Sequence, residues 1–186
     1  IRWWRATIPS NSLASLYGIA ADCAERQVLG ADTAIDIEAI DETNTYIDIA
    51  LLLARLRRHD NFGLIALVGV QSNQYPRALD IARPFREAGI AVAIGGFHVS
   101  GCLSMLDGKA VDLDACRESG IAMFAGEAEG RLDTVLRDAA EGRLAPVGYV
   151  DGGMKAEMDI AALHSKRLQL FGVCNKMRNA AQRGFA

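Results

Sequence analysis

The sequence has no closely spaced cysteines, which argues against the common zinc and iron–sulfur motifs. Its four cysteines, Cys23, Cys102, Cys116 and Cys174, are scattered singly over 186 residues. Structural zinc sites and iron–sulfur clusters draw most of their ligands from short cysteine-rich runs. We therefore expect reduced thiols and no metal site, because a chain that is 51% hydrophobic can bury a core without disulfide bonds.

An excess of positive charge and long apolar runs are also missing. The chain has 20 Lys and Arg against 23 Asp and Glu, a formal net charge of -3. Phosphate backbones and anionic surfaces are usually bound by a concentrated basic face. No apolar run is long enough to cross a bilayer, and no signal-peptide pattern is present at the start. We expect a cytoplasmic protein that binds neither nucleic acid nor membranes.

Several familiar catalytic and nucleotide-binding motifs do not occur. The sequence has no P-loop, no G-x-G-x-x-G after its first expected strand, no G-x-S-x-G elbow and no acidic cluster typical of a receiver domain. These absences argue in turn against nucleotide hydrolysis, dinucleotide binding, esterase chemistry and phosphorelay.

What the sequence does contain is a repeated alternation of strand-like apolar runs and helical periodicity. The strand-like runs cover residues 1–8, 33–40, 64–70, 90–94 and 121–124. Strands that alternate with helices form right-handed crossovers and a parallel sheet. We predict an α/β domain over residues 1–150, with a doubly wound five-stranded parallel sheet in the flavodoxin-like or Rossmann-like order 2-1-3-4-5.

Residues 151–186 differ in character and are predicted to form a basic amphipathic tail or linker. After Asp151-Gly152-Gly153, the apolar residues Leu163, Leu170, Cys174 and Met177 fall on one helical stripe. We expect this C-terminal helix to pack on its own domain or on a second copy, which favours a homodimer. A membrane-surface or partner-binding helix is the alternative.

Glycine and neutral polar residues follow the expected strands. In a parallel sheet the carboxyl ends of the strands meet at one edge, where ligands bind. Glycines there lack a Cβ, and we expect a side chain at Gly96 to intrude on a ligand. The residues predicted to form one ligand site are Asn11, Ser12, Gln71, Ser72, Asn73, Gln74, Gly95, Gly96, Phe97, His98, Gly126 and Glu127.

The chemistry of this edge favours binding over catalysis. Residues 71–74 offer neutral hydrogen-bonding groups that suit the amides and phosphodiester of a large neutral ligand. We expect His98 to bond a ligand or its own loop, because no second metal ligand accompanies it. Glu127 either contacts the ligand or braces its loop, and helix capping explains one of Glu127 and Glu129. No catalytic residue is predicted, because neither carboxylate has a nucleophile, metal or basic partner.

Taken together, these loops resemble the cobalamin-binding domain at the N-terminus of many radical S-adenosylmethionine enzymes. The resemblance covers residues 1–149, and its most specific parts are Gly95-Gly96-Phe97-His98 and Gly126-Glu127-Ala128-Glu129 at their mutual spacing. It implies a Rossmann-like sheet whose edge holds the corrin ring and whose interior crevice takes the nucleotide tail. It also implies ligand contacts from residues 71–73, Gly95, Gly96 and Glu127.

The sequence departs from related domains at two motifs. It lacks D-x-H-x-x-G after the first strand, so cobalamin would be bound without a histidine from that motif. It also lacks the C-x-x-x-C-x-x-C that holds the family's four-iron cluster, so we expect these residues alone not to be catalytic. The iron–sulfur cluster and S-adenosylmethionine would belong to a part outside this sequence.

Two other interpretations stay open. One is a degenerate, ligand-free Rossmann-like domain with a structural or dimerisation role. The other is a flavin-binding or nucleotide-binding module that uses the same edge, although only Phe97 and Tyr75 offer aromatic walls there.

Overall fold

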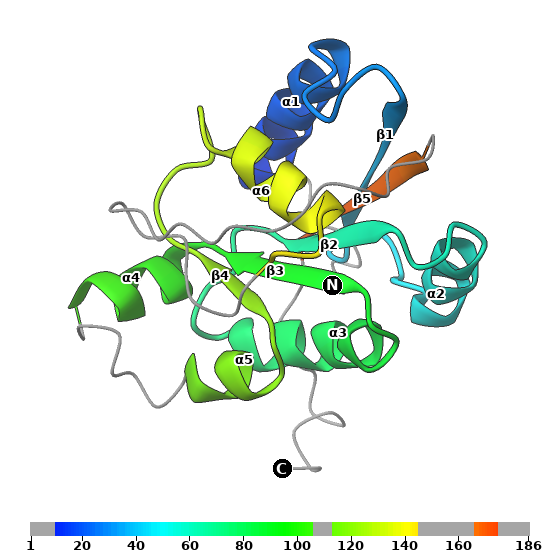
Figure 1. Cartoon of the computed structure of the whole chain (residues 1–186). Coiled ribbons are helices and arrows are strands. Elements are labelled where there is room, and N and C mark those ends of the chain that lie inside the picture. Colours follow the sequence, from blue (N-terminus) through cyan, green and yellow to red (C-terminus); the bar gives the residue numbers. More distant parts are fainter. Residues whose placement is uncertain (1–9, 106–112, 145–165, 175–186) are drawn as a thin grey trace.

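The computed structural model describes residues 10–105, 113–144 and 166–174, which form an α/β domain around a parallel sheet (Figure 1). The helices are α1 (Asn11–Glu25), α2 (Ile49–Arg57), α3 (Tyr75–Glu87), α4 (Phe97–Met105), α5 (Asp114–Glu118) and α6 (Leu132–Ala140). The strands are β1 (Thr33–Asp41), β2 (Gly63–Leu67), β3 (Ala91–Gly95), β4 (Ala122–Phe124) and β5 (Lys166–Cys174). Among these helices, none is long and apolar enough to cross a membrane.

All five strands are parallel, and their order is β1-β5-β2-β3-β4. The predicted order 2-1-3-4-5 is therefore wrong, although four of the predicted strands are confirmed in their expected relative places. The position between β1 and β2, predicted for residues 1–8, is taken by β5. The segment 1–8 itself lies outside the described residues.

The predicted C-terminal helix is wrong over residues 166–174, which form β5. Leu170, Phe171 and Val173 are 2%, 1% and 0% exposed, and they point to both faces of the sheet. An apolar run buried on both faces is typical of a central parallel strand, whereas an amphipathic helix would bury one stripe only. Leu170 therefore belongs to a strand and not to the helical stripe from which we predicted a homodimer. The remaining tail residues lie outside the described part of the chain.

The two faces of the sheet are covered differently. Helices α2, α3 and α5 and the start of α4 cover one face, where bulky residues such as Leu56, Ile81 and Phe85 are completely buried. Helices α1 and α6 cover the other face (Figure 1), where the sheet presents smaller residues including Ala66, Ala93 and Ala122. This second face therefore leaves space between its helices and the strands.

Candidate functional site

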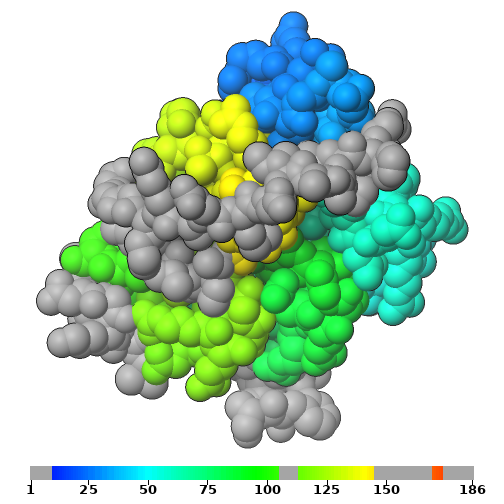
Figure 2. All heavy atoms as spheres, in the orientation of Figure 1, coloured from blue at the N-terminus to red at the C-terminus, as the bar shows by residue number. Residues whose placement is uncertain are grey.

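A pocket of about 570 Å³ opens at the carboxyl edge of the sheet and continues between α1 and α6. The two helices contact each other on this face of the sheet, and β2 and β3 form the floor between them. In Figure 2 the yellow atoms of α6 adjoin the blue atoms of the N-terminal part of the described chain. Ligand pockets in proteins commonly measure about 300–1,000 Å³. The pocket is therefore large enough for a sizeable organic ligand.

One face of α1 forms the first wall, and it changes from polar to apolar with depth. Ser12, Ser15, Leu16 and Ile19 line the pocket at helical spacing. Ser10 fixes the start of this helix, because its hydroxyl accepts a hydrogen bond from the Leu13 amide at 3.3 Å. The wall extends about 10 Å from Ser12 to Ile19 at the usual helical rise.

The floor consists of small residues on neighbouring strands. Ala66 of β2 and Ala93 of β3 are paired in register, and each is 8% exposed. Gly95 continues the row toward the edge, and Leu64 lies at the deeper end. Larger side chains at these positions would fill the space under α1 and α6.

Gly96 holds two of the loops together and does not make room for a ligand. Its φ is +137°, and a Cβ there would clash with the backbone nitrogen of Val70 and lie 2.6 Å from the carbonyl carbon of Gly69. The expectation that such a side chain would intrude on a ligand is corrected accordingly. Backbone bonds join the same loops, from the Val70 amide to the Gly95 carbonyl and from the His98 amide to the Val70 carbonyl.

The polar loop after β2 contributes Gln71 to the pocket, whereas Ser72, Asn73 and Gln74 are not among the lining residues. The side-chain oxygen of Gln74 accepts a hydrogen bond from the Gln71 amide at 2.9 Å. That bond braces the turn into α3.

His98 is buried away from the pocket. Its Nδ1 lies 3.1 Å from the Ser72 hydroxyl, and its ring centroid lies 4.3 Å from that of Tyr75. Its Nε2 lies 3.9 Å from the Cys102 thiol. The imidazole therefore connects the start of α4 to the loop after β2.

The loop after β4 and the start of α4 complete the mouth. Gly126, Glu127, Ala128 and Glu129 line it, and the Gly126 amide donates to the Ser100 hydroxyl at 3.1 Å. Phe97 also lines the mouth and is 71% exposed.

Eight of the twelve predicted site residues line this one pocket. They are Asn11, Ser12, Gln71, Gly95, Gly96, Phe97, Gly126 and Glu127. Sequence reasoning missed the deep walls, which include Leu16, Ile19, Ala66, Ala93, Leu132 and Val135. The helical stripe on α1 and the alanines within two apolar strands were the available signals.

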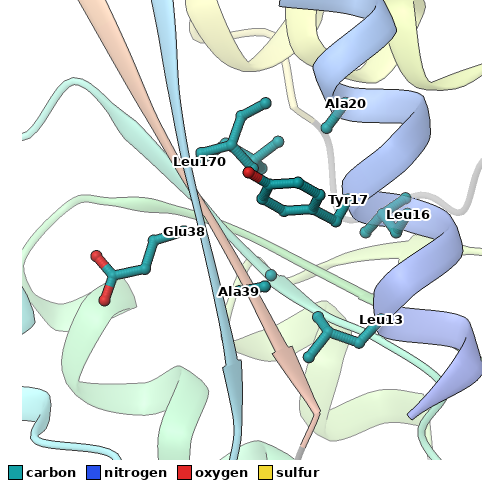
Figure 3. A pocket seen from close by; sticks show the side chains of 9 residues that line it. Leu13, Leu16, Tyr17, Ala20, Glu38, Ala39 and Leu170 are labelled. Carbon is teal, nitrogen blue, oxygen red and sulfur yellow. The ribbon is translucent and has the colours of Figure 1, made fainter. Parts of the chain in front are cut away.

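A second hollow, between α1 and the strands β1 and β5, is too small for a ligand. Its volume is about 10 Å³, comparable to the space needed for a single water molecule. Leu13, Tyr17 and Ala20 line it from the helix side, while the Glu38 carboxylate lies on the other side of the sheet (Figure 3).

Within the described residues, no three His, Cys, Asp or Glu side chains are grouped to hold a metal ion. Cys23, Cys102 and Cys116 form no disulfide there. Burial raises the pKa of the Cys23 and Cys116 thiols above their ordinary value of 9.0, which disfavours reactive thiolates.

Comparison with known proteins identifies no relative, because no family model, curated protein or solved structure matches the chain. The fold is an α/β domain with a five-stranded parallel sheet and a deep pocket at its carboxyl edge.

Proposed function

We propose that this chain is a cobalamin-binding domain of a radical S-adenosylmethionine enzyme. One observation carries the proposal: the pocket begins at the carboxyl edge among polar groups, which are neutral except for Glu127 and Glu129, and continues as an apolar slot between α1 and α6. The resemblance of the edge loops to such domains points to the same ligand.

The order of chemical groups in the pocket matches that in cobalamin. A corrin ring carries neutral amide side chains, and its nucleotide tail ends in an apolar benzimidazole base. At the mouth, Asn11, Ser12 and Gln71 offer neutral donors and acceptors for amides. Deeper in the slot, Ile19 and Val135 offer apolar surface for the base.

The described histidines suit a cofactor that is held without a protein ligand to cobalt. His98 is bonded to Ser72 and packs against the Tyr75 ring at a tilt, outside the pocket. His59 is exposed in the turn between α2 and β2, at the opposite edge of the sheet. When bound, cobalamin supplies a cobalt centre that can carry an alkyl group. The protein residues would position and shield it.

We assign no reaction to these 186 residues alone. A catalytic part with its iron–sulfur cluster and S-adenosylmethionine would lie outside this sequence, and the exposed mouth with Phe97 would face it. Cobalamin binding by this chain is the step that can be tested directly.

The test is binding of hydroxocobalamin, measured by visible absorption of the protein peak after gel filtration and by titration. Wild-type protein should retain the corrin spectrum. Ala93→Leu should weaken binding at least tenfold, because the added carbons occupy the slot floor. The matched control, Ala14→Leu, changes an exposed residue of α1 and should bind as wild type does.

A colourless wild-type peak at saturating ligand would contradict the proposal. Retention of flavin mononucleotide in place of cobalamin would favour a flavin-binding module. Binding of neither would favour the ligand-free structural domain.

A further inference from the structure

We infer that the slot selects corrinoids with an apolar, benzimidazole-type base over corrinoids that carry a purine base. The inference rests on the proposed function and names the class of cofactor that the pocket accepts.

The polar side chains of the pocket are confined to its mouth. On α1 they are Asn11, Ser12 and Ser15, all in the first turn and a half of the helix. The others come from the loops and helix start that follow β2, β3 and β4, including Gln71 and Glu127. The part of the ligand that reaches beyond these groups meets a different surface.

The deep part of the slot is apolar on every side. Its side chains are Ile19, Leu64, Ala66, Ala93, Leu132 and Val135. The backbone of the floor is already engaged, because β2 pairs with β5 on one side and with β3 on the other. A polar group that enters the deep slot therefore finds no side chain among the described lining residues with which to form a hydrogen bond.

The two kinds of base differ in what they would bury. Both have one imidazole nitrogen that can face cobalt, but adenine adds two ring nitrogens and an amino group. Dimethylbenzimidazole has methyl groups and ring carbons at the corresponding edge. Polar groups that leave water without a new partner weaken binding, whereas apolar groups favour it.

The experiment compares three corrinoids on the wild-type protein, all with the same aquo upper ligand: cobalamin, its adenine analogue and cobinamide, which has no base. Dissociation constants are measured by titration. We expect cobalamin to bind at least tenfold more tightly than the adenine analogue, equivalent to about 1.4 kcal/mol at 25 °C.

A second arm tests whether the apolar wall is the cause. Val135→Thr keeps the shape of the side chain and adds one hydroxyl to the deep slot, so it should narrow the preference several-fold. Val28→Thr, outside the pocket lining, should leave the preference unchanged.

The outcomes separate the inference from the proposed function. Equal affinity for cobalamin and the adenine analogue, both tighter than cobinamide, overturns the selectivity and leaves the proposed function intact. Equal affinity for cobalamin and cobinamide overturns the role of the slot in holding the base, and with it the selectivity, but leaves cobalamin binding intact. Binding of none of the three corrinoids overturns the proposed function. If the wild-type protein prefers cobalamin to the adenine analogue and Val135→Thr leaves this preference unchanged, the apolar wall is not its cause.

Discussion

Gly96 shows how a single residue can shape the pocket through the packing of its backbone. Its missing side chain lets the loop after β3 lie directly against the backbone of Gly69 and Val70. His98, two residues later, then bonds Ser72 in the same neighbouring loop. The mouth of the pocket is thus held by contacts between loops.

Gly96→Ala should destabilise the fold by about 3 kcal/mol or more, because the new Cβ meets backbone and the φ of +137° strains any L-residue. Chemical denaturation measures the change. Gly18→Ala is the control, since nothing lies within 4 Å of the added carbon on α1, and it should stabilise the protein by about 0.5–1 kcal/mol. Equal stability of wild type and Gly96→Ala would refute the close-packed loop.

At the scale of elements, a buried ion pair connects the end of β1 to the first turn of α3. The Arg77 Nη2 atom lies 2.5 Å from Glu42 Oε1, and the side chains are 12% and 2% exposed. The Nε atom of Arg77 also donates to both carboxylate oxygens of Glu42, at 3.1 and 3.3 Å. This forked geometry fixes the β1–α2 connection against the helix that follows β2.

Arg77→Met should lower the free energy of unfolding by about 3–5 kcal/mol, because it leaves the buried Glu42 carboxylate without its guanidinium. Arg26→Met is the control: it breaks the pair with Asp22 on α1, where both side chains are more than half exposed, and should change little. Urea denaturation of the two variants in parallel gives the comparison. Similar losses of unfolding free energy in Arg77→Met and Arg26→Met would show that burial of the Arg77–Glu42 pair does not increase its contribution to stability.

The elements also show where sequence reasoning succeeded and where it could not. β2, β3 and β4 were predictable, because each is a short apolar run bounded by glycine or polar residues. β5 was not, because Leu170, Cys174 and Met177 fit a helical spacing equally well and the pairing partners of β5 are remote in sequence.

The site, like the strands, had one part that could be predicted from the sequence and one part that could not. Edge residues such as Gln71 and Glu127 could be found from their positions after strands. The slot could not, because Ala66 and Ala93 have the ordinary composition of a buried strand. The space above these two alanines exists only because the strand register places them side by side under α1 and α6.

For the whole molecule, β5 joins two parts of the sheet. In the described sheet β1 pairs with β5 alone, while β2, β3 and β4 form a continuous block on its other side. Phe171 and Val173 of β5 belong to the larger core, and Leu170 belongs to the core under α1 and α6. Both cores therefore depend on this strand.

A chain that ends at residue 165 should lose its cooperative thermal unfolding, followed by circular dichroism, because β1 then has no neighbouring strand to pair with in its native place. A chain that ends at residue 174 keeps all five strands and should unfold cooperatively. If both chains melt like the full one, the central place of β5 is wrong.

The position of β5 also has a consequence for synthesis on the ribosome. β1 is the first of the five strands to emerge and β5 is the last, yet they are neighbours in the sheet. Roughly 100 residues separate the end of β2 from the end of β5, so at about 5–20 residues per second the inner edge of β2 waits roughly 5–20 s for its partner. During that time the nascent chain carries an unpaired strand edge and uncovered apolar side chains, which are the features that chaperones bind.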